Sequence, residues 1–90
     1  MAAGSSLTVA WKSNVAVSAG EFGVWLRSAT NDWYGGITVP AAGGTSFSSG
    51  VTLDVPAAAG YQAIVAWRAT PGSGDWVAWA TSPGSVTVTP

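Results

Sequence analysis

Residues Val51 to Ala69 read VTLDVPAAAGYQAIVAWRA and carry the clearest structural signal in this chain. Apolar and polar residues alternate from Val51 to Val55, which is the pattern of a strand with one buried face. Pro56 and Gly60 interrupt this pattern, and a longer alternating run follows from Tyr61 to Ala69. The alanines between Pro56 and Gly60 are too few for a helix, so the stretch predicts two strands joined by a corner.

The rest of the chain repeats this pattern, with short Val-, Thr- and Trp-rich runs separated by clusters of Gly, Pro, Asn and Ser. Strands with turn signals about every ten residues predict an all-β fold, a seven- to eight-stranded antiparallel β-sandwich, with a small closed barrel as the alternative. The expected strands are Leu7–Lys12, a short edge strand Asn14–Ser18, Phe22–Ser28, Trp33–Val39, Val51–Val55, Tyr61–Ala69, Trp76–Thr81 and Ser85–Thr89.

The segment from Leu53 to Pro56, followed by Gly60 to Val65, resembles the corner between strands E and F of fibronectin type III and immunoglobulin-like domains. In those domains a Tyr near the start of strand F donates a hydrogen bond to the backbone of the preceding corner. The resemblance implies this role for Tyr61, with Ala63 facing the core after it. The Cys that antibody-type domains carry two residues later is absent, so we expect an immunoglobulin/fibronectin III-like sandwich outside that type.

Composition excludes several kinds of chemistry. The chain has six Trp, three cationic and four acidic side chains, a net charge of −1, and neither His nor Cys. There is therefore no disulfide, thiol nucleophile or thiolate metal site, and the commonest general base is missing. Three scattered cations are a poor source of phosphate contacts, and no apolar run approaches the roughly 20 residues that cross a bilayer. We expect no cofactor, no nucleic-acid partner and no membrane partner.

Residues 1–6 lack the basic and apolar regions of a signal peptide, and we expect them to be an added, flexible start. Residues 7–90 are expected to form a single module, because a chain of this length makes one domain. A surface rich in Ser, Thr, Gly and Ala and poor in charge suits a secreted, extracellular protein.

A domain of this size encloses two or three indoles, so the other tryptophans are expected at the surface. Trp11 shares a face with Leu7 and Val9, and both it and Trp67 are predicted to face the core. Trp25 is predicted to point outward. The odd spacing of Trp76 and Trp79 predicts opposite faces, with only one of the two buried. The exposed set is drawn from Trp25, Trp33, Tyr34, Trp76 and Trp79.

Two segments of the chain are roughly similar to each other, WLRSATNDWYGG at 25–36 and WRATPGSGDW at 67–76. A two-residue turn at 71–72 would place Arg68 opposite Asp75 and Trp67 opposite Trp76, and a longer loop would shift this register. A turn at 30–31 would place Arg27 diagonal to Asp32. Two interpretations stay open: cross-strand ion pairs worth under about 1 kcal/mol, or polar groups that bind ligand hydroxyls beside an aromatic wall.

Exposed indoles on a weakly charged sheet suit the apolar C–H face of a sugar ring, with a few polar groups meeting its hydroxyls. We therefore predict a binding module for a neutral polysaccharide or oligosaccharide. The predicted ligand-binding residues are Trp25, Arg27, Asp32, Trp33, Tyr34, Arg68, Asp75, Trp76 and Trp79.

Three segments, Phe22–Leu26, Trp33–Gly36 and Ser82–Val88, resemble the modules found at the ends of β-1,3-glucanases, carbohydrate-binding module family 56. The resemblance implies a monomeric, non-catalytic module that attaches a larger multidomain enzyme to insoluble β-glucan, with catalysis elsewhere in that enzyme. A glycoside hydrolase would need two carboxyl groups about 5–9.5 Å apart across a cleft, which four scattered acidic residues do not predict. A structural or interdomain sandwich without a ligand, and a self-assembling lectin, remain as alternatives.

Overall fold

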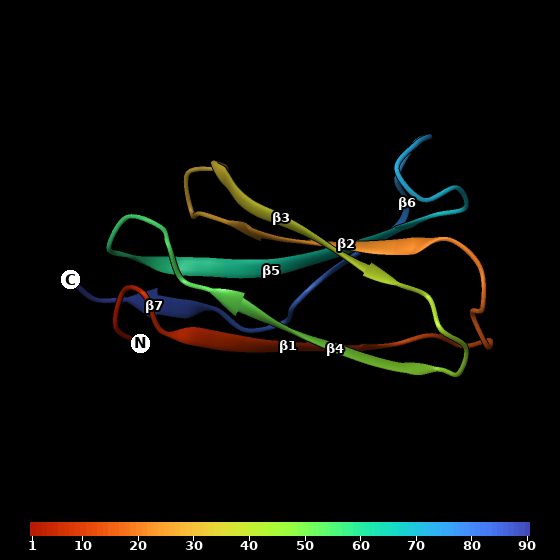
Figure 1. The fold of residues 1–90 in the computed structure, drawn as a ribbon. Coiled ribbons are helices and arrows are strands. Elements are labelled where there is room, and N and C mark those ends of the chain that lie inside the picture. Colours follow the sequence, from red (N-terminus) through yellow and green to blue (C-terminus); the bar gives the residue numbers. More distant parts are fainter.

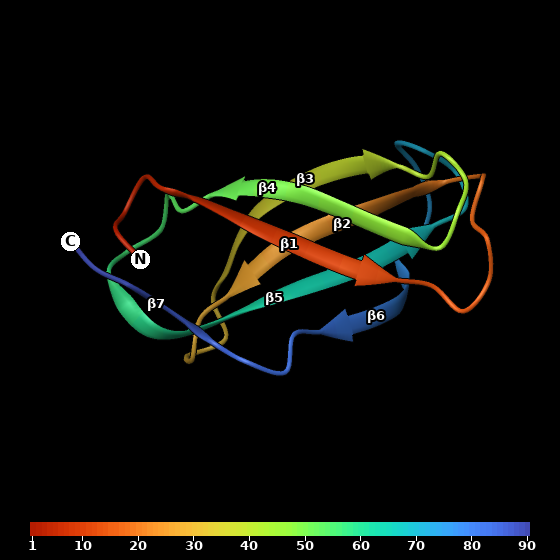
Figure 2. The same ribbon diagram turned by 90° about the horizontal axis from the view of Figure 1, so that it is seen from below.

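Seven β-strands and no helix make up the protein in a computed structural model that describes residues 1–90. The strands form two antiparallel sheets, one with the order β1-β4 and one with the order β3-β2-β5-β6, in which β7 also pairs with β5. The sheets lie over one another, as Figures 1 and 2 show, so the predicted all-β, sandwich-like architecture is confirmed at this level. The strands are β1 (Ser6–Lys12), β2 (Glu21–Arg27), β3 (Trp33–Pro40), β4 (Ser46–Thr52), β5 (Ala58–Arg68), β6 (Val77–Thr81) and β7 (Val86–Val88). The structure has no helix long and apolar enough to span a bilayer.

The core fills the space between the sheets. The even-numbered side chains of β2 face it, and Val24 and Leu26 are almost completely buried, as the alternation predicts. The odd-numbered side chains of β2 consequently lie on the outer face of the five-stranded sheet. The other buried members of the core are Val9, Phe22, Ala41, Val51, Leu53, Tyr61, Val65 and Val88.

The predicted tyrosine corner is present. The hydroxyl of Tyr61, a residue only 1% exposed, donates a hydrogen bond to the backbone carbonyl of Pro56. Burial raises the pKa of Tyr61 above its ordinary value of 10.0, with smaller contributions from Tyr34 and Asp32. The bond fixes the path of the chain between β4 and β5, which lie in different sheets.

Two predicted strands were wrong. The strand expected at Val51–Val55 is β4, which starts at Ser46 and pairs with β1 from Lys12↔Ser46 to Ser6↔Thr52. The Ser- and Gly-rich first half of β4 has low β-propensity and gives no apolar alternation, so the sequence pattern predicted only the last residues of this strand. The segment Asn14–Ser18 is a loop, in which Val17 exchanges backbone hydrogen bonds with Gly43 and Gly44.

The chain termini lie close together at one end of the sandwich (Figure 1). Ala2 forms a parallel bridge with Thr89, and the amide of Ala3 donates to the carbonyl of Thr89 at 2.9 Å. The amino group of Met1 donates to the carbonyl of Thr87. The residues before β1 therefore lie beside the last residues of the chain and are hydrogen-bonded to them.

Candidate functional site

Four tryptophans gather on the outer face of the five-stranded sheet, and we call Trp25, Trp33, Trp76 and Trp79 the tryptophan cluster. Trp25, on the central strand β2, contacts all three others, with ring centroids 6.2 Å from Trp33, 5.0 Å from Trp76 and 5.5 Å from Trp79. Trp33 and Trp79 also meet each other, at 5.9 Å. Residues as far apart in sequence as Trp25 and Trp79 therefore form one aromatic surface, because β3, β2, β5 and β6 lie side by side.

The Trp25 indole packs against two glycines. A Cβ atom built on Gly23 would lie 2.3 Å from Cη2 of Trp25, and one built on Gly36 would lie 3.1 Å from its Nε1. The indole therefore lies flat across the backbone of β2 and β3, in space that any side chain at Gly23 would occupy. Gly36 has a φ of 103°, at the irregularity that shifts the β2–β3 register after Val24.

Trp76 also contacts Arg68, which is itself held in an ion pair. The guanidinium carbon of Arg68 lies 4.2 Å from the centroid of the Trp76 ring, a cation–π contact worth about 0.5–2 kcal/mol. Arg68 in turn forms an ion pair with Glu21, its cross-strand neighbour on β2. The carboxylate of Glu21 also accepts a hydrogen bond from the backbone amide of Gly72, at 2.9 Å. This amide and then Arg68 lower the pKa of Glu21 below its ordinary value of 4.5.

Trp33 and Trp79 are the open part of the tryptophan cluster, with 45% and 53% of their surface exposed, whereas Trp25 and Trp76 are half-buried. A cleft of about 290 Å³ lies beside them and is floored by Ile64, which is nearly inaccessible. Its remaining lining residues are Arg27 and Thr81.

The charged group of this cleft is Arg27. Its Nη2 donates to the Oε1 of Gln62 at 3.1 Å, and the Nε2 of Gln62 donates to the carbonyl of Ser82 at 3.2 Å. The only ion pair of the structure is that of Arg68 with Glu21, so Arg27 has no carboxylate partner. The Arg27 guanidinium is thus oriented by a neutral amide and keeps donors available at the cleft.

Three of the predicted site residues do not join the cluster as ligand-facing groups. Tyr34 points inward and meets Tyr61 with ring centroids 6.1 Å apart, so its predicted exposure was wrong. Asp32 is bound within its own turn, where it accepts from the hydroxyl of Thr30 at 2.9 Å. Asp75 is exposed in the loop before β6 and pairs with no cation.

The cross-strand pairs predicted within the two similar segments, 25–36 and 67–76, do not form, and the reason is local. The turn at 71–72 forms, since Thr70 bridges Ser73 as expected. Beyond this bridge the pairing register shifts by one residue. Trp67 therefore faces Val77 instead of Trp76, and Arg68 does not face Asp75. In the first copy, the loop has three residues between Ser28 and Asp32, with Asn31 at φ 66°, and Arg27 bonds to Gln62 instead of Asp32.

The prediction that Trp76 and Trp79 lie on opposite faces was also wrong, because both contact Trp25. Simple alternation holds only within a regular strand. Trp76 lies before β6, and Ala78 has a φ of 56°, which breaks the alternation between the two indoles.

Sequence reasoning missed four residues that build the site: Glu21, Gln62, Ile64 and Thr81. Glu21 was detectable, because it shares the odd-numbered face of β2 with Trp25 and Arg27. Gln62 and Ile64 face the same way on β5, but their places beside Arg27 and Trp25 depend on the β2–β5 register.

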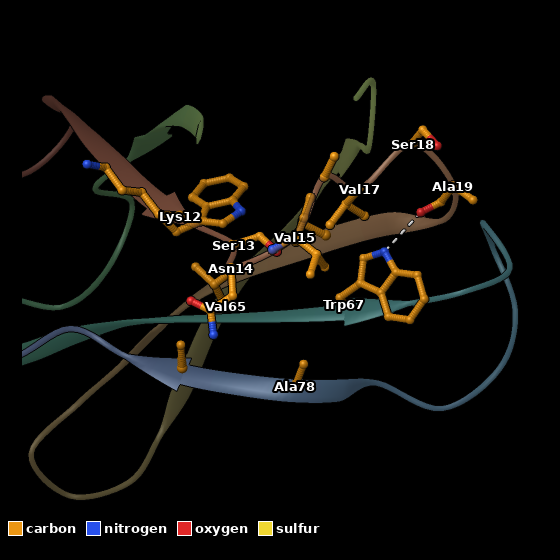
Figure 3. Close-up of a pocket in the computed structure, with 14 residues that line it drawn as sticks. Lys12, Ser13, Asn14, Val15, Val17, Ser18, Ala19, Val65, Trp67 and Ala78 are labelled. Atoms are coloured by element: carbon orange, nitrogen blue, oxygen red, sulfur yellow. Dashed lines mark hydrogen bonds between the residues drawn. The ribbon is translucent and has the colours of Figure 1, made fainter. Parts of the chain in front are cut away.

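The larger cavity of the molecule lies elsewhere. A space of about 600 Å³ opens between the sheets beside β1, and Figure 3 shows Trp67 and Val65 of β5 and the loop residues Val15 and Val17 around it. The indole of Trp67 donates to the carbonyl of Ala19 at 3.0 Å. Trp11 and Trp67 both pack against the core, as predicted, so neither belongs to the tryptophan cluster.

Comparison of the chain with protein-family models, with curated proteins and with solved structures gives no match.

Proposed function

We propose that this protein is a non-catalytic carbohydrate-binding module that attaches a secreted multidomain enzyme to a neutral polysaccharide, β-1,3-glucan being the first candidate. The observation that carries the proposal is the pair of exposed indoles, Trp33 and Trp79, set beside the oriented guanidinium of Arg27 on one sheet face. The resemblance of the chain to carbohydrate-binding module family 56 supplies the choice of glucan.

The chemistry of the face supports a neutral ligand with an apolar side. An indole presents a flat π surface to the C–H groups of a pyranose ring, and each such contact contributes about 0.5–1.5 kcal/mol beyond the area it buries. Only Arg27 brings an unpaired charge to the cleft, because Arg68 is neutralised by Glu21. Binding to one sugar chain is then weak, and several modules on one particle gain affinity through avidity.

We also propose that the β-sandwich is of the immunoglobulin/fibronectin III type. Three features support it: the tyrosine corner of Tyr61, the two-layer arrangement, and the repeated passage of the chain between sheets from β1 to β2 and from β3 to β4.

A non-catalytic role is supported by the state of the acidic groups. A glycosidase needs one carboxyl group that donates a proton and another that acts as nucleophile or base. The carboxylate of Glu21 is engaged by Arg68 and Gly72, and that of Asp32 by the hydroxyl of Thr30. Neither these two groups nor Asp54 and Asp75 line the cleft beside Trp79.

The test is depletion of the protein from solution by insoluble β-1,3-glucan, with reducing sugar measured in the same samples. We expect depletion without sugar release, and a loss of affinity of about tenfold or more for Trp33→Ala and Trp79→Ala, which equals about 1.4 kcal/mol. Val77→Ala is the matched control, because Val77 is an exposed apolar residue of the same strand as Trp79.

The structural and the enzymatic alternatives each have their own outcome in this assay. No depletion by β-1,3-glucan or any other polysaccharide would contradict the proposal and favour a structural, interdomain fibronectin III-like module with no ligand of its own. Release of reducing sugar would identify an enzyme. Unfolding of the Trp33→Ala variant would mean that this indole belongs to the core.

A further inference from the structure

The tryptophan cluster is not a flat platform. The plane of Trp25 makes angles of 71° with Trp33 and 88° with Trp76, and Trp33 and Trp79 meet at 83°. A ribbon-like polysaccharide or a crystalline surface is bound by rings that present their faces in one plane. In this cluster, the two exposed rings stand at a right angle, so a flat chain that stacked on one of them would meet the edge of the other.

A right-angled pair is instead the corner of a small site. Trp33 and Trp79 form its two walls, and the side chain of Ile64 forms its apolar floor. The volume of about 290 Å³ lies just below the range of about 300–1,000 Å³ found for pockets that enclose drug-sized ligands. The corner therefore encloses space for about one sugar ring.

Arg27 gives this corner a fixed polar side. Gln62 receives one hydrogen bond from Arg27 and is itself tied to the carbonyl of Ser82. Ser82 is anchored in turn, because its hydroxyl accepts from the amide of Ala63 at 3.0 Å and donates to the carbonyl of Gly84 at 3.1 Å. A planar guanidinium held in this way offers two parallel donors, the geometry that suits two neighbouring oxygens.

We propose that the module binds its polysaccharide by a chain end, with one terminal sugar ring seated between Trp33 and Trp79 and two adjacent oxygens of that ring accepting from Arg27. The inference rests on the proposed function and assigns Arg27 as the residue that determines specificity. Gln62 is a positioning residue, since it acts through Arg27. A terminal ring is substituted on one side only, so it enters a corner between two walls and a floor more readily than an internal ring, which is substituted on both sides.

The experiment compares soluble β-1,3-glucan fractions of decreasing chain length, used at equal mass and followed by tryptophan fluorescence. For recognition of a chain end, the apparent affinity per unit mass rises in proportion to the number of ends. The affinity per mole of chain changes less than about threefold between a disaccharide and a hexasaccharide. An affinity per mole that grows with every added residue would overturn the inference and leave the proposed function intact. An absence of binding by every fraction would overturn the inference, whereas the proposed function fails only if no insoluble polysaccharide depletes the protein.

Two further arms identify the end and test Arg27. Borohydride reduction opens the ring at the reducing end only, so unchanged affinity of the reduced disaccharide assigns the non-reducing end, and lost affinity assigns the reducing end. Arg27→Lys keeps the charge but not the planar fork, and we expect at least tenfold weaker binding with unchanged circular dichroism. Lys12→Gln, which removes a cation from the other sheet, is the matched control and should bind normally. Full affinity of the Arg27→Lys variant would exclude the role given to the fork.

Discussion

Gly23 offers a test of the tryptophan cluster that adds a single methyl group. Its backbone has an ordinary conformation, so Ala is allowed there, and in a strand Ala is normally better than Gly by about 0.5–1 kcal/mol. The new Cβ, however, would lie 2.3, 2.8 and 2.9 Å from three carbons of the Trp25 indole. Carbon atoms in contact are about 3.5–4.0 Å apart, so the indole must move by at least roughly 1 Å.

The cost of this movement follows from the contacts of Trp25. Overpacking of this kind costs about 1–3 kcal/mol, which outweighs the gain from replacing Gly. The shifted ring also loses its present geometry against Trp76 and Trp79, each of which contributes about 0.5–1.5 kcal/mol. We expect Gly23→Ala to be destabilised by about 1–3 kcal/mol and to bind β-1,3-glucan about tenfold more weakly.

The assay is chemical denaturation combined with circular dichroism, in which closely spaced indoles give an exciton signal. Gly23→Ala should show a smaller exciton signal together with its loss of stability. Gly50→Ala is the matched control, because Gly50 is also inside a strand and its new Cβ would meet only the Ser6 hydroxyl, at 3.2 Å. We expect its stability within about 0.5 kcal/mol of the parent. A Gly23→Ala variant with parental stability and an unchanged exciton signal would refute the placement of Trp25.

Three further predictions concern the framework. Because the pKa of Glu21 is lowered in the folded protein, its charged form stabilises the fold fully above pH 4.5. This stabilisation is lost as the pH falls through the lower folded-state pKa. Denaturation curves of Glu21→Gln should therefore show a smaller loss of stability on acidification than those of the parent. Tyr61→Phe removes the hydrogen bond to Pro56, so its Tm should fall while binding is retained, and an unchanged Tm would contradict the role of the corner. Leu26→Ala leaves a cavity in the core and should cost about 2–5 kcal/mol of unfolding free energy, whereas a cost below about 1 kcal/mol would show that Leu26 is not packed as described.

Local patterns predicted those parts of the fold that depend on local physics. Alternation along β2 placed Val24 inside and Trp25 outside, because side chains of a regular strand point alternately to its two faces. The corner at Tyr61 was predictable for a similar reason, since the Tyr and its acceptor Pro56 are near neighbours in sequence.

The parts that failed depend on backbone irregularity or on distant pairing. The face of Trp76 could not be read from its spacing to Trp79, because Ala78 takes a positive φ that alternation does not anticipate. The partner of Arg68 was sought across the nearest turn, but it is Glu21, which reaches it through the β2–β5 pairing. A single sequence carries no direct signal for which strands become neighbours.

Trp33 and Trp79 lie at the proposed ligand site, Trp25 and Trp76 lie half-buried beside them, and Trp11 and Trp67 pack against the core. The side-chain N–H resonances of the tryptophans report each indole separately. The measurement is a nitrogen–proton correlation spectrum of the labelled protein, with the six indole signals assigned by single Trp→Phe substitutions and followed during addition of β-1,3-glucan disaccharide. We expect the largest shifts for Trp33 and Trp79, smaller shifts for Trp25 and Trp76, and none for Trp11 and Trp67. Shifts confined to Trp11 and Trp67 would contradict the proposed site, and so would a spectrum that saturating disaccharide leaves unchanged.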